Sequence, residues 1–396
     1  MQYFLDNQRP CGLVLDRQSN HGPSRAHGLC STAATGMGLI SLALAAAPQH
    51  RLLTPRAAAD RARAALKAAL ESLPHERGVV PHFVHSASGA VYGADTFSTV
   101  ETAWLLAGAL WSAAFLRDRE LTALATTLYE RVDWGHWATP DGPGQGLLRH
   151  GKDAHGRFLG CAWDRLNGET AFMYVLAAGA AEGRALPAAG WQALRPFVGT
   201  VAGLSFNNAD LGLFVFQYGL DLLDLERWQA PAAVDLWAEA AVAVRANERA
   251  CRAAADRFST YRRFWGLSAG DGPGEPPRPD VYRAYSPAGP LDGTAHLTAA
   301  LASVAHEPDA VLRNLDEARR DGELGALGRY GFSNVNLDRR WVGRDMVGID
   351  AGAAVLALDN YLHAGRVRRV FQALPCVREG LGRLGSAAAG STGRPG

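Results

Sequence analysis

WDRLNGETAFMY, residues 163–174, places an acid, Glu169, just inside a predicted helix that follows a loop rich in Trp, Asp and Asn. Similar arrangements recur at residues 95–101, 265–272 and 348–352. Each puts a carboxylate at a helix entrance or in a loop, and most of these carboxylates have aromatic neighbours. The recurrence points toward carbohydrate chemistry, in which carboxyl groups act on the glycosidic bond and aromatic rings hold the sugar.

Helical signals run along the whole chain. Thr54-Pro55, followed by an Ala-rich run to Leu73, supplies an N-cap, a proline at the first helical position and good helix formers. The same criteria predict further helices near 31–47, 98–116, 119–132, 167–182, 189–203, 211–226, 231–254, 294–305, 308–321, 350–364 and 367–380. Strand signals are nearly absent, and only residues 78–92 are typical of a short β-hairpin.

About twelve helices, most of them apolar on more than one face, predict an all-α fold. Six helical hairpins close as a single-domain (α/α)6 toroid, in which acids from distant parts of the sequence meet at one end of the barrel. We assign this domain to residues 1–380 and expect residues 381–396, rich in Gly, Ser and Ala, to form a flexible tail. The long irregular segments 133–166 and 265–293 are rich in Gly, Pro, Trp and Asp, which favours functional loops.

Composition excludes several classes of function. The chain has 396 residues, 48% hydrophobic, with 40 Lys+Arg against 39 Asp+Glu. This balance leaves no surplus charge for nucleic acid or an anionic membrane surface. Its length suits one large core. The motifs of nucleotide-binding loops, serine hydrolases and zinc proteases are missing from the sequence, and we expect neither a cofactor nor a metal.

Cysteines and the N-terminal segment bear on the compartment. The five cysteines are scattered and include no C-x-x-C pair, which indicates buried or free thiols rather than a disulfide framework or a zinc site. Residues 1–10 lack the pattern of a secretory signal. The apolar stretch 37–47 is too short to span a bilayer, so we expect no membrane insertion. A cytoplasmic location is expected, or a periplasmic one if a leader is missing.

Four carboxylates are the candidate catalytic groups, and each has a structural alternative. Glu169 is an acid catalyst if burial beside Trp163 raises its pKa, or a charge that stabilises the helix dipole behind an Asn167 N-cap. Glu101 fits the S-x-x-E capping box that begins at Ser98. Asp350 is placed where an N-cap belongs.

Two further acids lie in predicted turns. Asp271 lies in Gly-Asp-Gly-Pro, most often a simple turn. Asp95 follows a Tyr-Gly-Ala turn, where it binds substrate or makes local hydrogen bonds.

Five tryptophans fall in predicted loops, where indole rings flanked by Gly and Asp form platforms for sugar rings. These are Trp134, Trp137, Trp163, Trp265 and Trp341. Arg17 and Arg249 are candidate ligands for sugar hydroxyls, although single polar residues are more often structural or solvated.

Ten short blocks carry a resemblance that covers nearly the whole chain. In chain order they are GLVLDR (12–17), STAATGMGL (31–39), VETAWLLAGAL (100–110), WDRLNGE (163–169), LFVFQY (213–218), NERAC (247–251), WGLSAGDG (265–272), GF (331–332), GIDAG (348–352) and DNY (359–361). Together they resemble the bacterial glycoamylase-like family, which contains endo-β-1,2-glucanases and the related domain of cyclic β-1,2-glucan synthases.

The resemblance implies an α/α barrel, an active site at one end of it, and glucan cleavage without a metal. It makes Glu169 the acid, with Asp350, Glu101 or Asp271 as its partner, and an oligo- or polysaccharide as the substrate. Inversion of the anomeric centre is favoured by the resemblance alone. Tyr218, Tyr285 and Phe332 complete the predicted substrate-binding set.

This chain departs from the family pattern at several positions. Ser98 stands where many members carry an acid, Phe216 replaces a histidine, Gly270 replaces a serine, and Gly168 is inserted before Glu169. Three alternatives remain at this stage. The first is a transglycosylase that uses the same cleft, the second is a non-catalytic glycan-binding protein, and the third is a helical scaffold in which all these acids are caps.

Overall fold

The computed structural model describes residues 1–142, 144–225 and 234–391, without the side chains of 94–96 and 386–391. Its helices are α1 Gln2–Asn7, α2 Thr32–Ala45, α3 Pro55–Glu71, α4 Thr99–Leu116, α5 Arg119–Glu130, α6 Gly168–Ala178, α7 Ala188–Gln192, α8 Phe214–Gln217, α9 Leu236–Ala253, α10 Thr260–Arg263, α11 Leu297–Leu301, α12 Pro308–Arg320, α13 Gly348–Leu362, α14 Arg366–Gln372 and α15 Pro375–Ser391. The chain is therefore rich in helix, as the sequence predicts.

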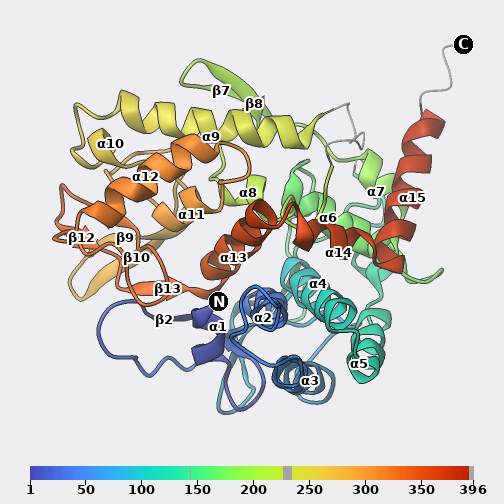
Figure 1. Ribbon diagram of the computed structural model, residues 1–396. Coiled ribbons are helices and arrows are strands. Elements are labelled where there is room, and N and C mark those ends of the chain that lie inside the picture. The colour runs from blue at the N-terminus through green and yellow to red at the C-terminus, as the bar shows by residue number, and fades with distance from the viewer. Residues whose placement is uncertain (143, 226–233, 392–396) are drawn as a thin grey trace, which may run out of the picture.

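Six helices contact one another in succession. The pairs α2–α4, α4–α6, α6–α8, α11–α13 and α13–α2 are all in contact, and Figure 1 shows α2, α4 and α13 near the centre of the molecule. Between α8 and α11, the side-chain amide of Gln217 donates to the carbonyl of Ala299 (2.6 Å) and to the hydroxyl of Ser303 (2.7 Å). A second set of helices covers these from outside: α3 contacts α2, α5 contacts α4, α15 contacts α6, α9 contacts α8, α12 contacts α11, and α14 contacts α13.

Two glycines allow α2 and α4 to cross with their backbones in contact. A Cβ atom on Gly36 would lie 2.1 Å from the carbonyl oxygen of Trp104, and one on Gly108 would lie 2.0 Å from that of Gly36. Both helices are almost wholly buried. Helix α4 is apolar enough to cross a membrane by length and composition, but 72% of it is buried, as expected of a core helix.

Replacing Gly36 by Ala is expected to destabilise the protein by about 1–3 kcal/mol or more, because backbone atoms at the crossing cannot give way. Gly382 in α15 is the matched control, since a Cβ there meets nothing within 4 Å. Gly382→Ala should instead stabilise the helix by up to about 1 kcal/mol. Urea unfolding measures both, and equal effects of the two substitutions would contradict the close crossing.

Strands are more numerous than the sequence predicts. They are β1 Val14–Leu15, β2 Arg17–Ser19, β3 Leu29–Ser31, β4 Pro81–His85, β5 Val91–Ser98, β6 Gly151–Asp153, β7 Val198–Val201, β8 Leu204–Asn207, β9 Ala269–Glu275, β10 Arg278–Ala284, β11 Val335–Asn336, β12 Trp341–Val342 and β13 Asp345–Val347. The predicted hairpin at 78–92 is present as β4–β5, within a five-stranded sheet of order β1-β3-β4-β5-β6. The pairing of Arg17 with Val347 between β2 and β13 joins the N-terminal segment to the start of α13.

Two predicted helices are wrong for most of their length. Residues 189–203 form only the short helix α7 and then enter the β7–β8 hairpin, while 211–226 contains only α8 as α-helix within its described part. The hairpin turns at Ala202 and Gly203, which both have positive φ (49° and 76°). Turns of this kind match the twist of paired strands, and the β-branched residues of Val198–Val201 favour a strand.

Two other predicted segments also differ. The predicted loop 265–293 contains the β9–β10 hairpin, so Asp271 lies in a strand and not in a turn. Helix α15 continues to Ser391, into the segment predicted as a flexible tail, because Ala and Ser tolerate helix well enough to extend it.

Candidate active site

One cavity of about 510 Å³ lies at the N-terminal ends of α2, α4, α6 and α13. Its wall combines carboxyl groups with aromatic rings, among them Asp16, Arg17, His82, Glu101, Trp104, Trp163, Glu169, Phe214, Tyr218 and Tyr282. Because these residues come from positions 16 to 282, the cavity depends on contacts between distant parts of the chain.

Glu169 is the second residue of α6 and is 7% exposed. Asn167 caps this helix as predicted, since its side chain accepts from the amide of Thr170 (2.8 Å). The pKa of Glu169 is raised to about 7; burial is the main cause, the indole N–H of Trp104 (3.5 Å) lowers it, and the charge of Glu101 acts in the same direction as burial. Near neutral pH a substantial fraction of Glu169 is therefore protonated and able to donate a proton.

Glu101, in the first turn of α4, is held by a neighbouring helix rather than by a capping box. The backbone amide of Ala33, at the start of α2, donates to Glu101 Oε2 (3.0 Å), and His82 Nε2 lies 3.2 Å from Glu101 Oε1. The amide of Ser98, which a capping box would use, donates to the carbonyl of Val80. Glu101 thus stabilises the N-terminus of α2 and faces the cavity.

Glu169 and Glu101 are one group of acids, and Asp16, Asp271 and Asp350 form a second group around Arg17. Asp271, in β9, is 5% exposed and accepts from Arg17 Nη1 (2.9 Å), and Arg17 also pairs with Asp16 (3.2 Å). Asp350, in the first turn of α13, is partly exposed. The pKa of Asp350 is raised to about 7; burial by the surrounding protein is the main cause, the charges of Asp271 and Asp16 act in the same direction, and Arg17 opposes them.

Asp350 differs from Asp271 and Glu101 in its bonding. Within the described part of the chain its carboxylate forms no hydrogen bond or ion pair. The N-cap of α13 is Val347, so Asp350 is not the cap that its position suggests. A partly exposed, unbonded carboxylate is available to bind water or a sugar hydroxyl.

The phenol of Tyr218 interacts with charges from both groups of acids. Burial raises the pKa of its phenol well above the usual value, and the charges of Asp350, Glu169 and Glu101 contribute in the same direction. Since these interactions weaken with distance, both acidic groups lie near the same phenol. Carboxylates from α4 and α6 line the cavity, and Asp350 of α13 lies beside its wall, directly after the lining residue Ile349 and near Tyr218.

Of the five predicted platforms, Trp163 alone lines this cavity among the residues described. It stacks on His150 at 3.8 Å and donates to Thr99 Oγ1 (3.1 Å). Trp134, Trp137 and Trp265 are fully buried, so a sugar cannot reach their rings and their predicted role is wrong. Large indoles in Gly-rich segments fill the core here, which the sequence pattern does not distinguish from a platform.

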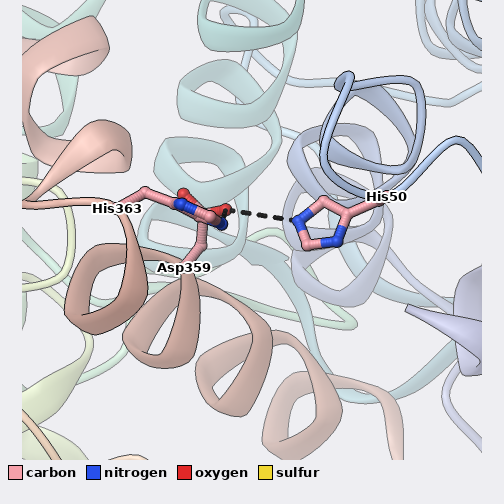
Figure 2. Close-up of side chains that lie close together, drawn as sticks. All are labelled: His50, Asp359 and His363. Atoms are coloured by element: carbon pink, nitrogen blue, oxygen red, sulfur yellow. Dashed lines mark ion pairs between the residues drawn. The ribbon is translucent and has the colours of Figure 1, made fainter.

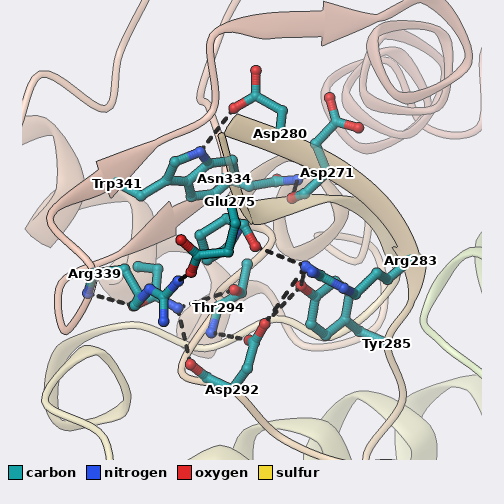
Figure 3. Close-up of polar contacts among 12 residues, drawn as sticks. Asp271, Glu275, Asp280, Arg283, Tyr285, Asp292, Thr294, Asn334, Arg339 and Trp341 are labelled. Carbon is teal, nitrogen blue, oxygen red and sulfur yellow. Dashed lines mark hydrogen bonds and ion pairs between the residues drawn. The ribbon is translucent and has the colours of Figure 1, made fainter. Parts of the chain in front are cut away.

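Trp341 and Tyr285 hold the β9–β10 hairpin rather than line the cavity (Figure 3). The indole of Trp341 donates to Asp280 Oδ1 (2.8 Å), and the phenol of Tyr285 donates to Asp292 Oδ2 (2.9 Å). The side-chain amide of Asn334 donates to the carbonyl of Asp271 (3.0 Å). These bonds fix the strand that carries Asp271.

Three other predicted binding residues lie elsewhere or outside the description. Arg249 is exposed on α9, and Phe332 lines a different hollow beside α12. Neither contributes to the cavity, so both predictions are corrected. Asp95 belongs to β5, and its side chain is outside the described part of the structure.

The positions that depart from the family pattern are also set back from the cavity wall as described. Ser98 is the N-cap residue of α4. Phe216 packs against Phe206, with 5.9 Å between the centroids of the two rings. A Cβ on Gly270 would lie 2.7 Å from the ring of His296, so this histidine fills the space of a larger side chain.

The sequence analysis missed four prominent residues of the cavity: Asp16, His82, Trp104 and Tyr282. Trp104 lies inside an apolar helix, where an indole is assigned to the core by default. Tyr282 belongs to a strand that the sequence signals did not reveal. Asp16 lies in the GLVLDR block, directly before Arg17, which is the residue of that block predicted to bind substrate.

Replacing Trp104 by Phe is expected to move the alkaline limb of the pH–activity profile to higher pH. The substitution removes the N–H that lowers the pKa of Glu169, and it should reduce turnover by about tenfold. Trp111→Phe is the control, since that indole donates to the carbonyl of Val367 (2.9 Å) instead. Profiles of initial rate against pH test this, and an alkaline limb that moves equally in both variants would refute it.

His50, Asp359 and His363 form a second cluster, with ligand atoms within 4.8 Å of one another (Figure 2). The buried Asp359 already accepts from Arg366, whose Nε lies 3.0 Å from Oδ2, and Arg366 Nη2 lies 3.5 Å from His50. The guanidinium of Arg366 therefore neutralises the charge of the Asp359 carboxylate at the position where a metal ion would bind. We interpret the cluster as a buried ion pair that joins α13 to α14.

The helix-rich fold is one that glycoside hydrolases share, as solved structures of similar proteins show. A solved structure of an endo-β-1,2-glucanase from Chitinophaga pinensis, in complex with sophorotriose and glucose, superposes with a TM-score of 0.81 over 97% of this chain and 95% of that one, at 20% identity. A crystal structure from Bacteroides fragilis, described as a putative glucoamylase, gives 0.81 over 97% and 94%, at 21% identity.

A sequence match places the chain within this class. The family model described as "Putative glucoamylase" matches residues 161–375, more than half of the sequence. The chain belongs to this glycoamylase family.

An exo-β-1,2-glucooligosaccharide sophorohydrolase from Parabacteroides distasonis is 30% identical over 124 residues. The matched segment covers 31% of this chain and 16% of that relative.

Proposed function

We propose that the protein is a glycoside hydrolase that cleaves β-1,2-linked glucan. The observation that carries the proposal is that Glu169 lines the cavity and Asp350 lies beside its wall, next to Ile349 and near Tyr218, each acid with a pKa raised to about 7. Acetal hydrolysis needs one protonated carboxyl and one carboxylate at the same bond. The β-1,2 linkage is inferred from the endo-β-1,2-glucanase with the same fold and from the sophorohydrolase relative.

The fold supports the same proposal in finer detail. We propose that α2, α4, α6, α8, α11 and α13 are the inner layer of an (α/α)6 toroid and that α3, α5, α15, α9, α12 and α14 are its outer layer, from their contacts. The cavity then lies at the end of the barrel where the inner helices begin. There the helix dipoles favour negative charge on both Glu169 and Asp350, in opposition to the effect of burial.

The proposed reaction assigns one step to each carboxyl group. Glu169 donates its proton to the glycosidic oxygen as the bond from that oxygen to the anomeric carbon breaks. Asp350 takes a proton from a water molecule, whose oxygen bonds to the anomeric carbon from the opposite face. This displacement inverts the anomeric configuration, which carboxyl groups about 6.5–9.5 Å apart would permit.

The walls of the cavity suit a glucan. Trp163 and Tyr282, which both line the cavity, offer ring surfaces for the apolar faces of glucose, and Tyr282 is 48% exposed. Arg17 and His82 offer hydrogen bonds to hydroxyls. The volume of about 510 Å³ accommodates a short oligosaccharide and not a folded macromolecule.

The test is incubation of the purified protein with linear and cyclic β-1,2-glucans and with β-1,3-, β-1,4- and α-1,4-glucans. We expect new reducing ends with β-1,2-glucan, and product size separates endo from exo cleavage. Cleavage of α-1,4-glucan alone would refute the linkage. Binding without any new reducing end would refute catalysis and favour the glycan-binding alternative, while products longer than the substrate would indicate a transglycosylase.

A further inference from the structure

A second hollow adjoins the cavity of the candidate active site, and we call it the side cavity. It has a volume of about 360 Å³ and lies at the N-terminal end of α6. Three residues line both hollows: Trp163, Glu169 and Phe214. The rest of its wall comes mainly from the segment 161–165, from His150 and from the start of α8. Both hollows therefore border the carboxyl group that we propose as the acid.

The ring of Trp163 is fixed where the two hollows adjoin. Its indole N–H donates to Thr99 Oγ1 (3.1 Å), its backbone amide donates to the carbonyl of Leu148 (2.7 Å), and its carbonyl accepts from the phenol of Tyr174 (2.7 Å). His150 stacks on the indole, with 3.8 Å between the ring centroids and 9° between the ring planes. An aromatic ring held in this way offers a flat surface to the apolar face of a sugar without any rearrangement.

Polar side chains in the wall of the side cavity can bind sugar hydroxyls. Nη1 of Arg165 donates to both carboxylate oxygens of Asp210 (2.9 and 2.8 Å), which fixes the guanidinium and leaves its other N–H groups for a ligand. Asp164 is exposed, and its carboxylate forms no hydrogen bond or ion pair with any residue that the structure describes. A guanidinium donates to hydroxyl oxygens, and a carboxylate accepts from hydroxyl groups. The side cavity thus combines a ring with polar groups, as sugar-binding sites do.

The placement of the two proposed catalytic acids decides which part of a glucan the side cavity would receive. In the proposed reaction Asp350 activates the water that attacks the anomeric carbon. Asp350 directly follows Ile349, and among the residues described Ile349, Asp16 and Arg17 line the candidate active site and not the side cavity. The attacked sugar therefore belongs in the candidate active site. The glycosidic oxygen at Glu169 joins it to the departing sugar, which then lies on the side-cavity side of Glu169.

We propose that the side cavity is the subsite for the departing, reducing-end part of a β-1,2-glucan. The inference rests on the proposed function, because Glu169 and Asp350 set the direction of the bound chain. As the bond between the anomeric carbon and the glycosidic oxygen breaks, the proton of Glu169 passes to that oxygen and becomes part of a hydroxyl group on the sugar in the side cavity. The oxygen of water bonds to the anomeric carbon, and Asp350 takes the proton that the water loses.

Cys161 is a natural reporter for this subsite. It is exposed and lines the side cavity, whereas Cys11 is also exposed but lines neither hollow within the described ranges. The Glu169→Gln variant, which should bind linear β-1,2-glucan without cleaving it, is treated with iodoacetamide, and peptide mapping gives the rate of alkylation at each cysteine. At about ten times the Kd measured by calorimetry, the glucan should slow the alkylation of Cys161 about tenfold, because only the free protein reacts.

The rate at Cys11 should stay the same, and an α-1,4-glucan of similar length is the control ligand. Alkylation of Cys161 at the same rate with and without saturating β-1,2-glucan would overturn the assignment of the side cavity.

A second measurement uses the wild type and does not depend on the folding of Glu169→Gln. A bulky maleimide attached to Cys161 should occupy the side cavity and lower kcat/KM for β-1,2-glucan about tenfold, since the departing sugar loses its binding site. Cys161→Ser is the matched control, because it still reacts at Cys11. Each protein is compared with itself before treatment, and the treatment should leave the rate of Cys161→Ser unchanged.

The outcomes separate this inference from the proposed function. Undiminished cleavage of β-1,2-glucan by the labelled wild type, or an equal loss in the labelled Cys161→Ser variant, would overturn the subsite alone. A wild type that neither binds nor cleaves β-1,2-glucan before labelling would refute the proposed function, and the subsite with it.

Discussion

Glu169→Gln is expected to lower the turnover of β-1,2-glucan by about 10²–10⁴-fold, because it removes the proton donor and keeps the shape of the side chain. Glu120→Gln is the matched control. Glu120 is likewise the second residue of its helix, α5, but it lies on the surface and pairs with Lys67 (3.0 Å). Initial rates of reducing-end release measure both, and undiminished activity in Glu169→Gln would reject Glu169 as the acid.

The same substitution should make the protein more stable at alkaline pH. The pKa of Glu169 is raised to about 7 from an ordinary value of 4.5, so between these values the unfolded chain releases a proton that the folded protein retains. The contribution of Glu169 therefore reduces stability as pH rises through this window, and it reaches about 3 kcal/mol above pH 7. Urea unfolding at pH 5 and pH 8 should show that Glu169→Gln is stabilising only at the higher pH.

Asp350→Asn is the second substitution with a large expected effect, again about 10²–10⁴-fold in turnover. An amide cannot accept the proton of the attacking water, while the position of the side chain in the first turn of α13 is preserved. Asp309→Asn, at an exposed first-turn position of α12, is the control. A loss of activity in Asp271→Asn with none in Asp350→Asn would move the role of base to Asp271.

The pH dependence distinguishes the two carboxyl groups. The proposed mechanism needs Glu169 protonated and Asp350 ionised, and the pKa of each is raised to about 7, so activity should be confined to a narrow range around neutral pH. The residual activity of Asp350→Asn should lose the acid limb and retain the alkaline one. Loss of the alkaline limb instead would exchange the two assignments.

Local signals predicted the parts of the fold and site that local residues determine. The apolar helices α2, α4 and α13, the Asn167 cap and the first-turn position of Glu169 all follow from patterns within a few residues. What these acids contact depends on other segments. Glu101 is bonded by α2 rather than by its own helix, and no pattern around residue 101 encodes this.

The errors share a physical cause. An indole in a Gly-rich segment has the same local sequence whether it faces a cavity or fills the core, and the surrounding fold alone decides, as for Trp134 and Trp163. The β9–β10 hairpin was missed because its strands, AGDGPGE and RPDVYRA, contain glycines and prolines that local propensity assigns to loops. Long-range contacts from Asn334 and Trp341 stabilise it.

The pairing of β2 with β13 has a consequence for biosynthesis. Arg17 emerges from the ribosome early, but its strand partner Val347 and the carboxylate of Asp350 follow only after most of the polypeptide has been made. A nascent chain released before α13 is complete would carry Glu169 and Glu101 without their counterpart. Such fragments are expected to be inert toward glucan.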